Sequence, residues 1–270
     1  MGFSFLSWNV RHFKASPSRT KKIVNLIKKF NPDVFGIQEF SDKSVAQRLS
    51  SEHFKDYDFG ITESKGTMEI LVGYKRSKFG QAIYTQRREF NAGSQHLRPG
   101  AILSVRQRGQ KAFDNILFLH TDSGTKDKDY NNRKTMFKKI WKLNSVLKYQ
   151  PTQGGKSRLV VTGDLNTMGK GNTISGQDEI NKLDTDAQNN GMELLKKSHP
   201  NTWSSFGNKK SDLDHVLISN DVNIQQWFFS SDPTTTFPII VDGWVDLNDS
   251  ARKDFVTNIS DHSLLYGEIL

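Results

Sequence analysis

The sequence predicts one α/β domain built on mixed β-sheets. Hydrophobic residues make up 35% and aromatic residues 11% of the 270 positions, which is enough apolar surface to bury a sizeable core and excludes a disordered chain. Short apolar segments alternate with amphipathic ones, without a linker or an internal repeat, so we expect residues 1–270 to form a single domain. Several apolar segments follow one another without a helix between them, which favours mixed or antiparallel sheets over a purely parallel sheet.

The first fifty residues predict a strand, a helix, a second strand and a second helix. Residues 3–8 alternate with period two and start a strand, and residues 34–38 form a buried strand. Between them, residues 19–30 carry apolar side chains at helical spacing with lysines on the opposite face, and Asn31-Pro32-Asp33 ends this helix. Residues 42–50 predict a further helix, with Asp42 as its candidate cap.

The middle of the chain predicts three strands and the longest helix. The strands cover residues 69–75, 102–105 and 116–120. Residues 121–131 are polar and rich in Asp and Lys, so we expect a loop there. Residues 131–149 carry apolar side chains at helical spacing, and we expect this segment to pack its apolar face against a sheet.

The last third of the chain predicts four more strands. Residues 159–162 form a continuous apolar run, which is typical of a buried strand. Residues 168–176 contain three glycines and show no periodicity, so they predict a loop. Residues 213–218, 225–229 and 263–268 complete the set of strands.

Composition and charge narrow the function classes. The chain has 38 Lys and Arg against 29 Asp and Glu, a net charge of +9, which favours polyanionic partners such as nucleic acid or anionic lipid, although many basic domains bind neither. The absence of cysteine excludes disulfide scaffolds, thiolate nucleophiles and Cys-ligated metals. No apolar run approaches the ~20 residues of a membrane span, and no signal peptide is visible, so we expect a cytoplasmic protein.

Polar residues gather at the ends of the apolar strands. Because strand ends in an α/β protein converge on one edge of the sheets, these polar groups are expected to meet there without being buried unpaired. Carboxylates brought together repel one another, and a hard divalent cation relieves that repulsion; oxygen ligands favour Mg²⁺, with Mn²⁺ as the second choice and zinc well below. Such a site suits hydrolysis at phosphorus. The residues concerned are Asn9, Glu39, His120, Asp164, Asn166, Asp214, Asp261 and His262.

Five of these segments resemble, in chain order, the motifs of the endonuclease/exonuclease/phosphatase superfamily. The resemblance spans residues 3–268 and implies a four-layer α/β sandwich, in which two mixed β-sheets pack face to face between flanking helices, as in deoxyribonuclease I. The family includes nucleases, neutral sphingomyelinase and inositol polyphosphate phosphatases, and its members hydrolyse phosphoester bonds. The matching motifs are Trp8-Asn9-Val10-Arg11, Ile37-Gln38-Glu39, Gly163-Asp164-Leu165-Asn166-Thr167, Ser211-Asp212-Leu213-Asp214-His215-Val216-Leu217-Ile218 and Ser260-Asp261-His262.

The resemblance also implies roles for single residues. Glu39 would be the principal metal ligand, with Asn9 beside it and Asp261 near the metal. Asp164 would orient or activate the attacking water, and Asn166 would bind the phosphate.

His262 would contact the phosphate or act as a base, with Asp214 orienting its ring. His120 resembles the histidine of the deoxyribonuclease, sphingomyelinase and phosphatase branches, which makes abasic-site repair a poorer expectation. Glu69 resembles the carboxylate that pairs with this histidine, and Arg98 resembles a phosphate-contacting arginine.

Four further residues are candidates for nucleic-acid binding. Lys126, Lys128 and Arg133 follow His120 closely and would steer a polyanion towards the site, and Trp203 would border the substrate groove. We therefore expect a monomeric, Mg²⁺-dependent nuclease that hydrolyses DNA, or RNA, with little base specificity. The alternatives are a phosphoesterase of the same family acting on inositol phosphates, phospholipid or another small phosphodiester, and a non-catalytic binding module on this fold. Endo- and exonucleolytic cleavage both stay open.

Overall fold

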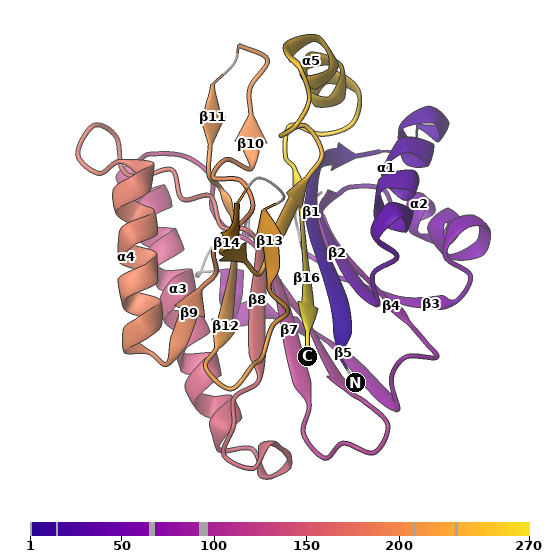
Figure 1. Ribbon diagram of the computed structural model, residues 1–270, viewed down its shortest axis with the longest axis vertical. Coiled ribbons are helices and arrows are strands. Elements are labelled where there is room, and N and C mark those ends of the chain that lie inside the picture. The colour runs from indigo at the N-terminus through magenta and orange to yellow at the C-terminus, as the bar shows by residue number, and fades with distance from the viewer. Residues whose placement is uncertain (1, 15, 65–67, 92–96, 208, 230–231) are drawn as a thin grey trace.

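Two six-stranded mixed sheets form the centre of the molecule (Figure 1). The computed structural model describes residues 2–14, 16–64, 68–91, 97–207, 209–229 and 232–270. The first sheet has the order β15-β16-β1-β2-β4-β3 and the second the order β5-β6-β7-β8-β12-β9. Each contains one parallel pair, β1 with β2 and β7 with β8, and its other pairs are antiparallel. The first sheet comprises β1 (Phe3–Phe13), β2 (Val34–Phe40), β3 (Tyr57–Ile61), β4 (Glu69–Lys75), β15 (Ile240–Asp242) and β16 (Leu264–Ile269). The second comprises β5 (Gln81–Arg87), β6 (Gly100–Arg106), β7 (Asp114–His120), β8 (Leu159–Asp164), β9 (Met192–Leu194) and β12 (Asp214–Ser219).

Helices cover the outer faces of the two sheets, which completes four layers (Figure 1). One apolar cluster joins the first sheet to its helices, a second lies between the sheets, and a third joins the second sheet to its helices. The four-layer α/β sandwich expected from the motifs is therefore confirmed. The helices on the first sheet are α1 (Pro17–Phe30), α2 (Lys43–Arg48) and the π-helical turn Leu49–His53. The helices on the second sheet are α3 (Asp127–Lys148) and α4 (Gly176–Asn189). The other helical elements are α5 (Asp249–Asn258) and the 3₁₀ turns Arg88–Asn91 and Pro151–Gln153. Two small hairpins, β10 (Trp203–Ser204) with β11 (Lys210–Ser211) and β13 (Trp227–Phe229) with β14 (Asp232–Phe237), are additional.

The period-two pattern of β1 explains how one strand serves two apolar layers. Phe5 packs between the two sheets, whereas Leu6 and Trp8 pack towards the outer helices, and all three are buried. The sheets approach closely at Gly36 of β2, where a Cβ atom would lie 2.1 Å from the ring of Phe118 in β7. Only a residue without a side chain fits between the two sheets at this position.

Several elements differ from those the sequence predicts. Helix α3 begins at Asp127, inside the segment expected to be a loop, because Asp127 and Asp129 in its first turn favour a helix N-terminus. Helix α4 was missed, although Ser175 and Asp178 form the reciprocal capping box that marks its start. Helix α5 and the strands β3, β5, β9 and β15 are also absent from the predicted elements. No helix of the described segments is long and apolar enough to cross a membrane.

Candidate active site

The two parallel strand pairs place their carboxyl ends next to each other, one pair from each sheet. Asn9 on β1 donates one amide hydrogen bond to Asp164 Oδ2 on β8, at 2.9 Å, and another to Glu39 Oε1 on β2, at 3.2 Å. Asn9 is fully buried, so this amide joins the sheets directly. The expected convergence of strand-end residues is thus present in the molecule, and Asn9 is its centre.

A change of register brings Glu39 to this edge. The pairing of β2 with β4 shifts between Ile37 and Phe40, and Glu39 adopts φ +58°, a left-handed conformation that is uncommon for a non-glycine residue. Such a conformation costs on the order of 1–3 kcal/mol and persists when the surroundings impose it. Here the backbone N–H of His12 donates to Glu39 Oε2 at 2.9 Å, which fixes the carboxylate. The irregularity thus turns a strand-end carboxylate towards the site.

His262 and Asp214 form a buried pair beside Asp164. His262 Nδ1 donates to Asp214 Oδ2 at 2.8 Å, and Nε2 lies 3.7 Å from Asp164 Oδ2. Burial opposes the charged imidazolium, but the carboxylates of Asp214 and Asp164 outweigh it and raise the pKa of His262 to about 10. Burial also raises the pKa of Asp164, although the positive charge of His262 acts to lower it. The ring is therefore a cation held with Nε2 facing Asp164.

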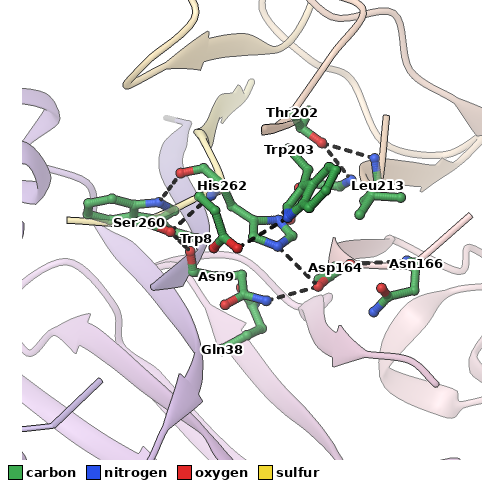
Figure 2. A network of polar contacts seen from close by, with 12 residues as sticks. Trp8, Asn9, Gln38, Asp164, Asn166, Thr202, Trp203, Leu213, Ser260 and His262 are labelled. Atoms are coloured by element: carbon green, nitrogen blue, oxygen red, sulfur yellow. Dashed lines mark hydrogen bonds and ion pairs between the residues drawn. The ribbon is translucent and has the colours of Figure 1, made fainter. Parts of the chain in front are cut away.

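Backbone contacts hold the His262 ring in place (Figure 2). Ser260 Oγ accepts from the backbone N–H of His262 at 3.0 Å and donates to the carbonyl of Asn9 at 2.7 Å. The indole N–H of Trp8 donates to the His262 carbonyl at 2.9 Å. Ser260 and Trp8 stand inside recognised motifs, yet the sequence did not assign them these supporting roles. They tie the loop before β16 to β1.

Thr202 and Trp203 support the site from the β10 hairpin. Thr202 Oγ1 accepts from the backbone N–H groups of Leu213 and Asp214, at 3.0 and 2.9 Å, and so fixes the start of β12. Trp203 is half-buried, pairs with His262 in an isolated bridge, and donates from its indole N–H to Asp261 Oδ2 at 3.2 Å. Trp203 therefore lies beside Asp261 and His262, and its contact with a substrate stays a prediction.

His120 lies between two carboxylates. Its Nε2 is 3.5 Å from Asp164 Oδ2 and 3.8 Å from Glu39 Oε1. Burial lowers the pKa of His120 well below its usual value, and the positive charges of Arg98 and His262 lower it further. The neutral ring can donate one N–H towards the carboxylates, whereas its buried Nδ1 has no hydrogen-bond partner among the described residues.

The expected pairing of Glu69 with His120 is not formed between these two described residues. Glu69 Oε2 accepts from Thr62 Oγ1 at 2.6 Å, and its Oε1 accepts from the backbone N–H and the hydroxyl of Ser64 at 2.9 and 2.7 Å. The end of β3 lies beside the start of β4, so these local donors occupy both oxygens. Glu69 thus stabilises a neighbouring loop rather than the histidine.

Asn166 lies two residues after Asp164, and Asp261 directly precedes His262. Asn166 follows β8 with φ +46°, its backbone N–H donates to Asp164 Oδ1 at 3.1 Å, and its side chain donates to the carbonyl of Thr121 at 3.3 Å. Asp261 contacts Trp203 and has Arg11 Nε at 3.9 Å, so its direct side-chain partners are not the other expected metal ligands. Its Oδ1 is buried and has no hydrogen-bond partner in the described part of the chain.

The donor set suits a hard divalent cation. Glu39, Asp164 and Asp261 supply carboxylate oxygens, at an edge without sulfur ligands. Asn9 turns its amide N–H groups to Glu39 and Asp164, while its Oδ1 accepts from the backbone N–H of Arg11 at 2.9 Å. The buried, unpartnered oxygen of Asp261 is the kind of atom that a cation satisfies. The three side chains with ligand atoms closest together are Asp164, Asp214 and His262, all within 4.8 Å, but Nδ1 of His262 is already taken by Asp214. The oxygen-rich side of this cluster could therefore hold the ion.

Arg98 lies close to the same carboxylates. Burial lowers its pKa, and the negative charges of Glu39 and Asp164 act in the opposite direction. One guanidinium nitrogen contacts the sulfur of Met68 at 3.1 Å, and the buried Nε has no hydrogen-bond partner among residues the structure describes. A cation with unused donors beside the site is well suited to hold a phosphate oxygen.

Arg133, in contrast, is not available to a substrate. Its side chain is fully buried on α3 and pairs through two nitrogens with Glu179 of α4, each at 2.8 Å. The remaining donors reach the carbonyls of Asp122, Gly124 and Gly169. The expectation that Arg133 contacts nucleic acid is wrong, because every guanidinium nitrogen is occupied inside the protein. It instead joins the loops that leave β7 and β8. Lys126 and Lys128, the other two basic candidates, are exposed at the start of α3.

Arg11 and Phe206 are two neighbours of the site that the sequence did not single out. The guanidinium of Arg11 lies 4.9 Å from the centre of the Phe206 ring, and that ring is half exposed. Arg11 belongs to the first motif, which was the available signal, whereas nothing in the sequence marks Phe206. Arg11 also lies 3.9 Å from Asp261 through its Nε.

Comparisons with known proteins agree with this architecture. The model of the endonuclease/exonuclease/phosphatase family matches residues 6–262. A truncated TDP2 from Caenorhabditis elegans superimposes with a TM-score of 0.68 at 16% identity, over 100% of this chain and 97% of that one. TDP2 from D. rerio, complexed with a single-strand DNA product, gives 0.66 at 16% over 100% and 99%, and the human Nocturnin catalytic domain with bound sulfate gives 0.66 at 15% over 100% and 94%. A comparison with curated proteins finds no match. The family match over almost the whole chain and the shared fold together show that this protein belongs to the endonuclease/exonuclease/phosphatase family.

Proposed function

We propose that this protein is a Mg²⁺-dependent phosphodiesterase that cleaves nucleic acid, with DNA as the first substrate to test and RNA as the second. The observation that carries the proposal is the chain of contacts from Glu39 through Asn9 and Asp164 to His262 and Asp214. Both sheets contribute to it, so residues 1–270 act as one catalytic domain. All of these residues come from one chain, so a monomer suffices.

The first part of the reaction is binding and charge neutralisation. Glu39, with Asn9 and Asp261 nearby, would hold Mg²⁺, with Mn²⁺ as a substitute; when bound, the ion polarises a phosphoryl oxygen and offsets the charge that develops in the transition state. Arg98 and Asn166 orient the phosphate through N–H donors. These interactions place the phosphorus in front of Asp164.

The second part is proton transfer. Asp164 lies where it can orient a water molecule and accept its proton, and its raised pKa makes it a better base than an exposed carboxylate. The imidazolium of His262, kept charged by Asp214, donates from Nε2 to a phosphoryl or leaving oxygen. His120 stays neutral and positions both carboxylates from its Nε2.

The net positive charge and the structural similarity to a DNA-bound protein support a nucleic-acid substrate. The net charge of +9 favours a polyanion, and contacts to phosphates alone give affinity with little base specificity. One structure of the same fold, D. rerio TDP2, is described as bound to a single-strand DNA product. The same catalytic set would also serve an inositol polyphosphate or a phospholipid, so these substrates belong in the test.

The decisive experiment is hydrolysis of supercoiled plasmid in Mg²⁺, with Glu39→Gln as the blank. We expect nicking that disappears in EDTA and falls by at least ~100-fold in the variant, because electrostatic stabilisation of the transition state is lost. Single-stranded DNA, RNA, inositol hexakisphosphate and sphingomyelin run in parallel. Intact nucleic acids with release of inorganic phosphate or phosphocholine would refute the nuclease assignment. Equal activity of the variant in a clean preparation would refute the metal assignment.

A further inference from the structure

Helix α3 carries an unusual concentration of positive charge. From Tyr130 to its last residue, Lys148, the helix contains six Lys or Arg residues and no Asp or Glu. A solvent-exposed helix usually mixes both signs, since i,i+4 pairs then stabilise it. One of the six, Arg133, is buried in its ion pair with Glu179. The other five are lysines whose charge has no counterpart on the helix itself.

Four lysines lie along one ridge of this helix, at intervals of four residues or a multiple of four. The α3 ridge consists of Lys126, Lys134, Lys138 and Lys142, and Tyr130 occupies the intervening position. None of the four makes an ion pair with a described residue. Lys134 lies 5.7 Å above the ring of Tyr130, which holds its ammonium at the ridge. The row is therefore a line of unneutralised cations.

Three acidic side chains near the ridge are already in ion pairs, and Asp129 in the first turn of α3 accepts from the backbone N–H of Lys126 at 3.1 Å. Asp127 pairs with Lys170 at 3.1 Å, Asp186 with Lys182 at 3.2 Å, and Glu179 with Arg133. These neighbours therefore offer the ridge little neutralisation.

Two hollows run beside the ridge. One of about 260 Å³, between α3 and α4, is lined by Lys134, Lys138 and Trp141 among others. The other, of about 450 Å³, lies on the opposite flank and is lined by Lys142, Arg87 and neighbouring side chains. Each hollow opens beside part of the ridge.

The ridge starts in the loop that follows His120. Lys126 ends the loop that leaves β7 after His120, and α3 then extends away from the site along the outer face of the second sheet (Figure 1). At 1.5 Å per residue, the ridge is about 24 Å long from Lys126 to Lys142. At ~3.4 Å per nucleotide of one strand, this length corresponds to about seven nucleotides.

We propose that the α3 ridge binds the sugar-phosphate backbone of the nucleic-acid strand that extends from the active site. This inference rests on the proposed function and adds the path that the substrate takes outside the catalytic centre. Ammonium groups on flexible stems bind phosphates as point charges, so the ridge gives length-dependent affinity without reading sequence. Of the basic residues that the sequence assigned to nucleic-acid binding, Lys126 belongs to the ridge, whereas Arg133 is buried.

The test measures binding of fluorescent oligo(dT) of 5 and 20 nucleotides in EDTA, which prevents hydrolysis, between 50 and 200 mM KCl. The test variant is Lys134→Gln/Lys138→Gln/Lys142→Gln. The matched control is Lys21→Gln/Lys28→Gln/Lys55→Gln, since these exposed lysines make no ion pair with a described residue and Lys28 lies over Phe54 as Lys134 lies over Tyr130. Two of the control positions are on α1, on the opposite side of the molecule (Figure 1).

We expect the unmodified protein and the control to bind the 20-mer more tightly than the 5-mer. The test variant should lose this preference, and its salt slope should be shallower by about 2, which is about 16-fold less loss of affinity over the fourfold change of salt. A test variant with the same slope and length preference as the control would refute the ridge and leave the nuclease proposal standing. Unmodified protein that binds neither oligonucleotide, or that prefers phosphatidylserine vesicles through these lysines, would overturn both the ridge and its nucleic-acid substrate.

Discussion

The pairing of Asp214 with His262 makes a quantitative prediction about pH. Asp214→Asn keeps the shape of the side chain and an oxygen that can accept from His262 Nδ1, but removes the negative charge. The pKa of His262 stands at about 10 because two carboxylates outweigh burial. Without Asp214, burial and the charge of Asp164 oppose each other, and we expect the pKa to return towards its ordinary value of 6.5.

The sign and size of the effect follow from this shift. A raised pKa keeps the imidazolium present at neutral pH, and activity that needs this cation is lost as the pH rises through the pKa. At pH 8 a group of pKa about 10 is ~99% protonated, whereas one of pKa 6.5 is ~3% protonated, so turnover of the variant should fall ~30-fold from protonation alone. At pH 6 the same calculation gives a loss of less than ~2-fold.

The assay is kcat for a chromogenic phosphodiester between pH 5.5 and 9, together with an NMR titration of the histidine rings in metal-free protein. Asp246→Asn is the control, since Asp246 pairs with His199 at 3.0 Å on an exposed part of the surface. The control should keep the profile of the unmodified enzyme. A loss in Asp214→Asn that is the same at every pH, or an unchanged NMR titration of His262, would refute the electrostatic role of this pair.

Three further changes test the site and the fold. His262→Ala should reduce hydrolysis to background while circular dichroism stays native; near-normal turnover would remove this residue from the catalytic set. Arg133→Met should lower the free energy of unfolding, measured by chemical denaturation, by about 3–5 kcal/mol, because it leaves Glu179 buried without its partner. The double variant with Glu179→Met should recover part of the lost stability. Full stability of the single variant would contradict the buried pair. Gly36→Ala should lower the free energy of unfolding by about 1–3 kcal/mol, because its methyl group would meet the Phe118 ring between the sheets. Phe118→Leu in the same chain should restore the stability. An unchanged melting temperature for Gly36→Ala would show that the sheets can move apart.

Local patterns were sufficient for most of the strands and for naming the polar residues that meet at one edge of the sheets. Period-two and continuous apolar runs identified β1, β2, β7, β8 and β16, because burial on one or both faces of a sheet leaves that pattern in the residues themselves. The polar residue that follows such a run lies at the end of its strand, and therefore at the edge of the sheet, independently of how the rest of the chain folds. For this reason Asn9, Glu39 and Asp164 could be named from the sequence, and hydrogen bonds now join all three.

The hydrogen-bond partners of the site residues could not be predicted from the sequence, since they depend on which strands are neighbours. Asn9 and Asp164 are 155 residues apart, and only the packing of the two sheets brings their side chains to 2.9 Å. Two predictions failed for the same reason. The sequence does not show that the loop donors beside β4 bind Glu69 in place of His120, and a buried arginine such as Arg133 looks the same in sequence as an exposed one.

The sequence alone thus determined the fold class, the family and the chemical types at the active edge, because these follow from apolar periodicity and from short motifs that are local in the chain. The tertiary structure decided the pairing of His262 with Asp214, the burial of Arg133 and the course of the α3 ridge. The physical reason is that the strength and direction of a charge or hydrogen bond depend on distance and burial, and both are set by contacts between segments far apart in sequence.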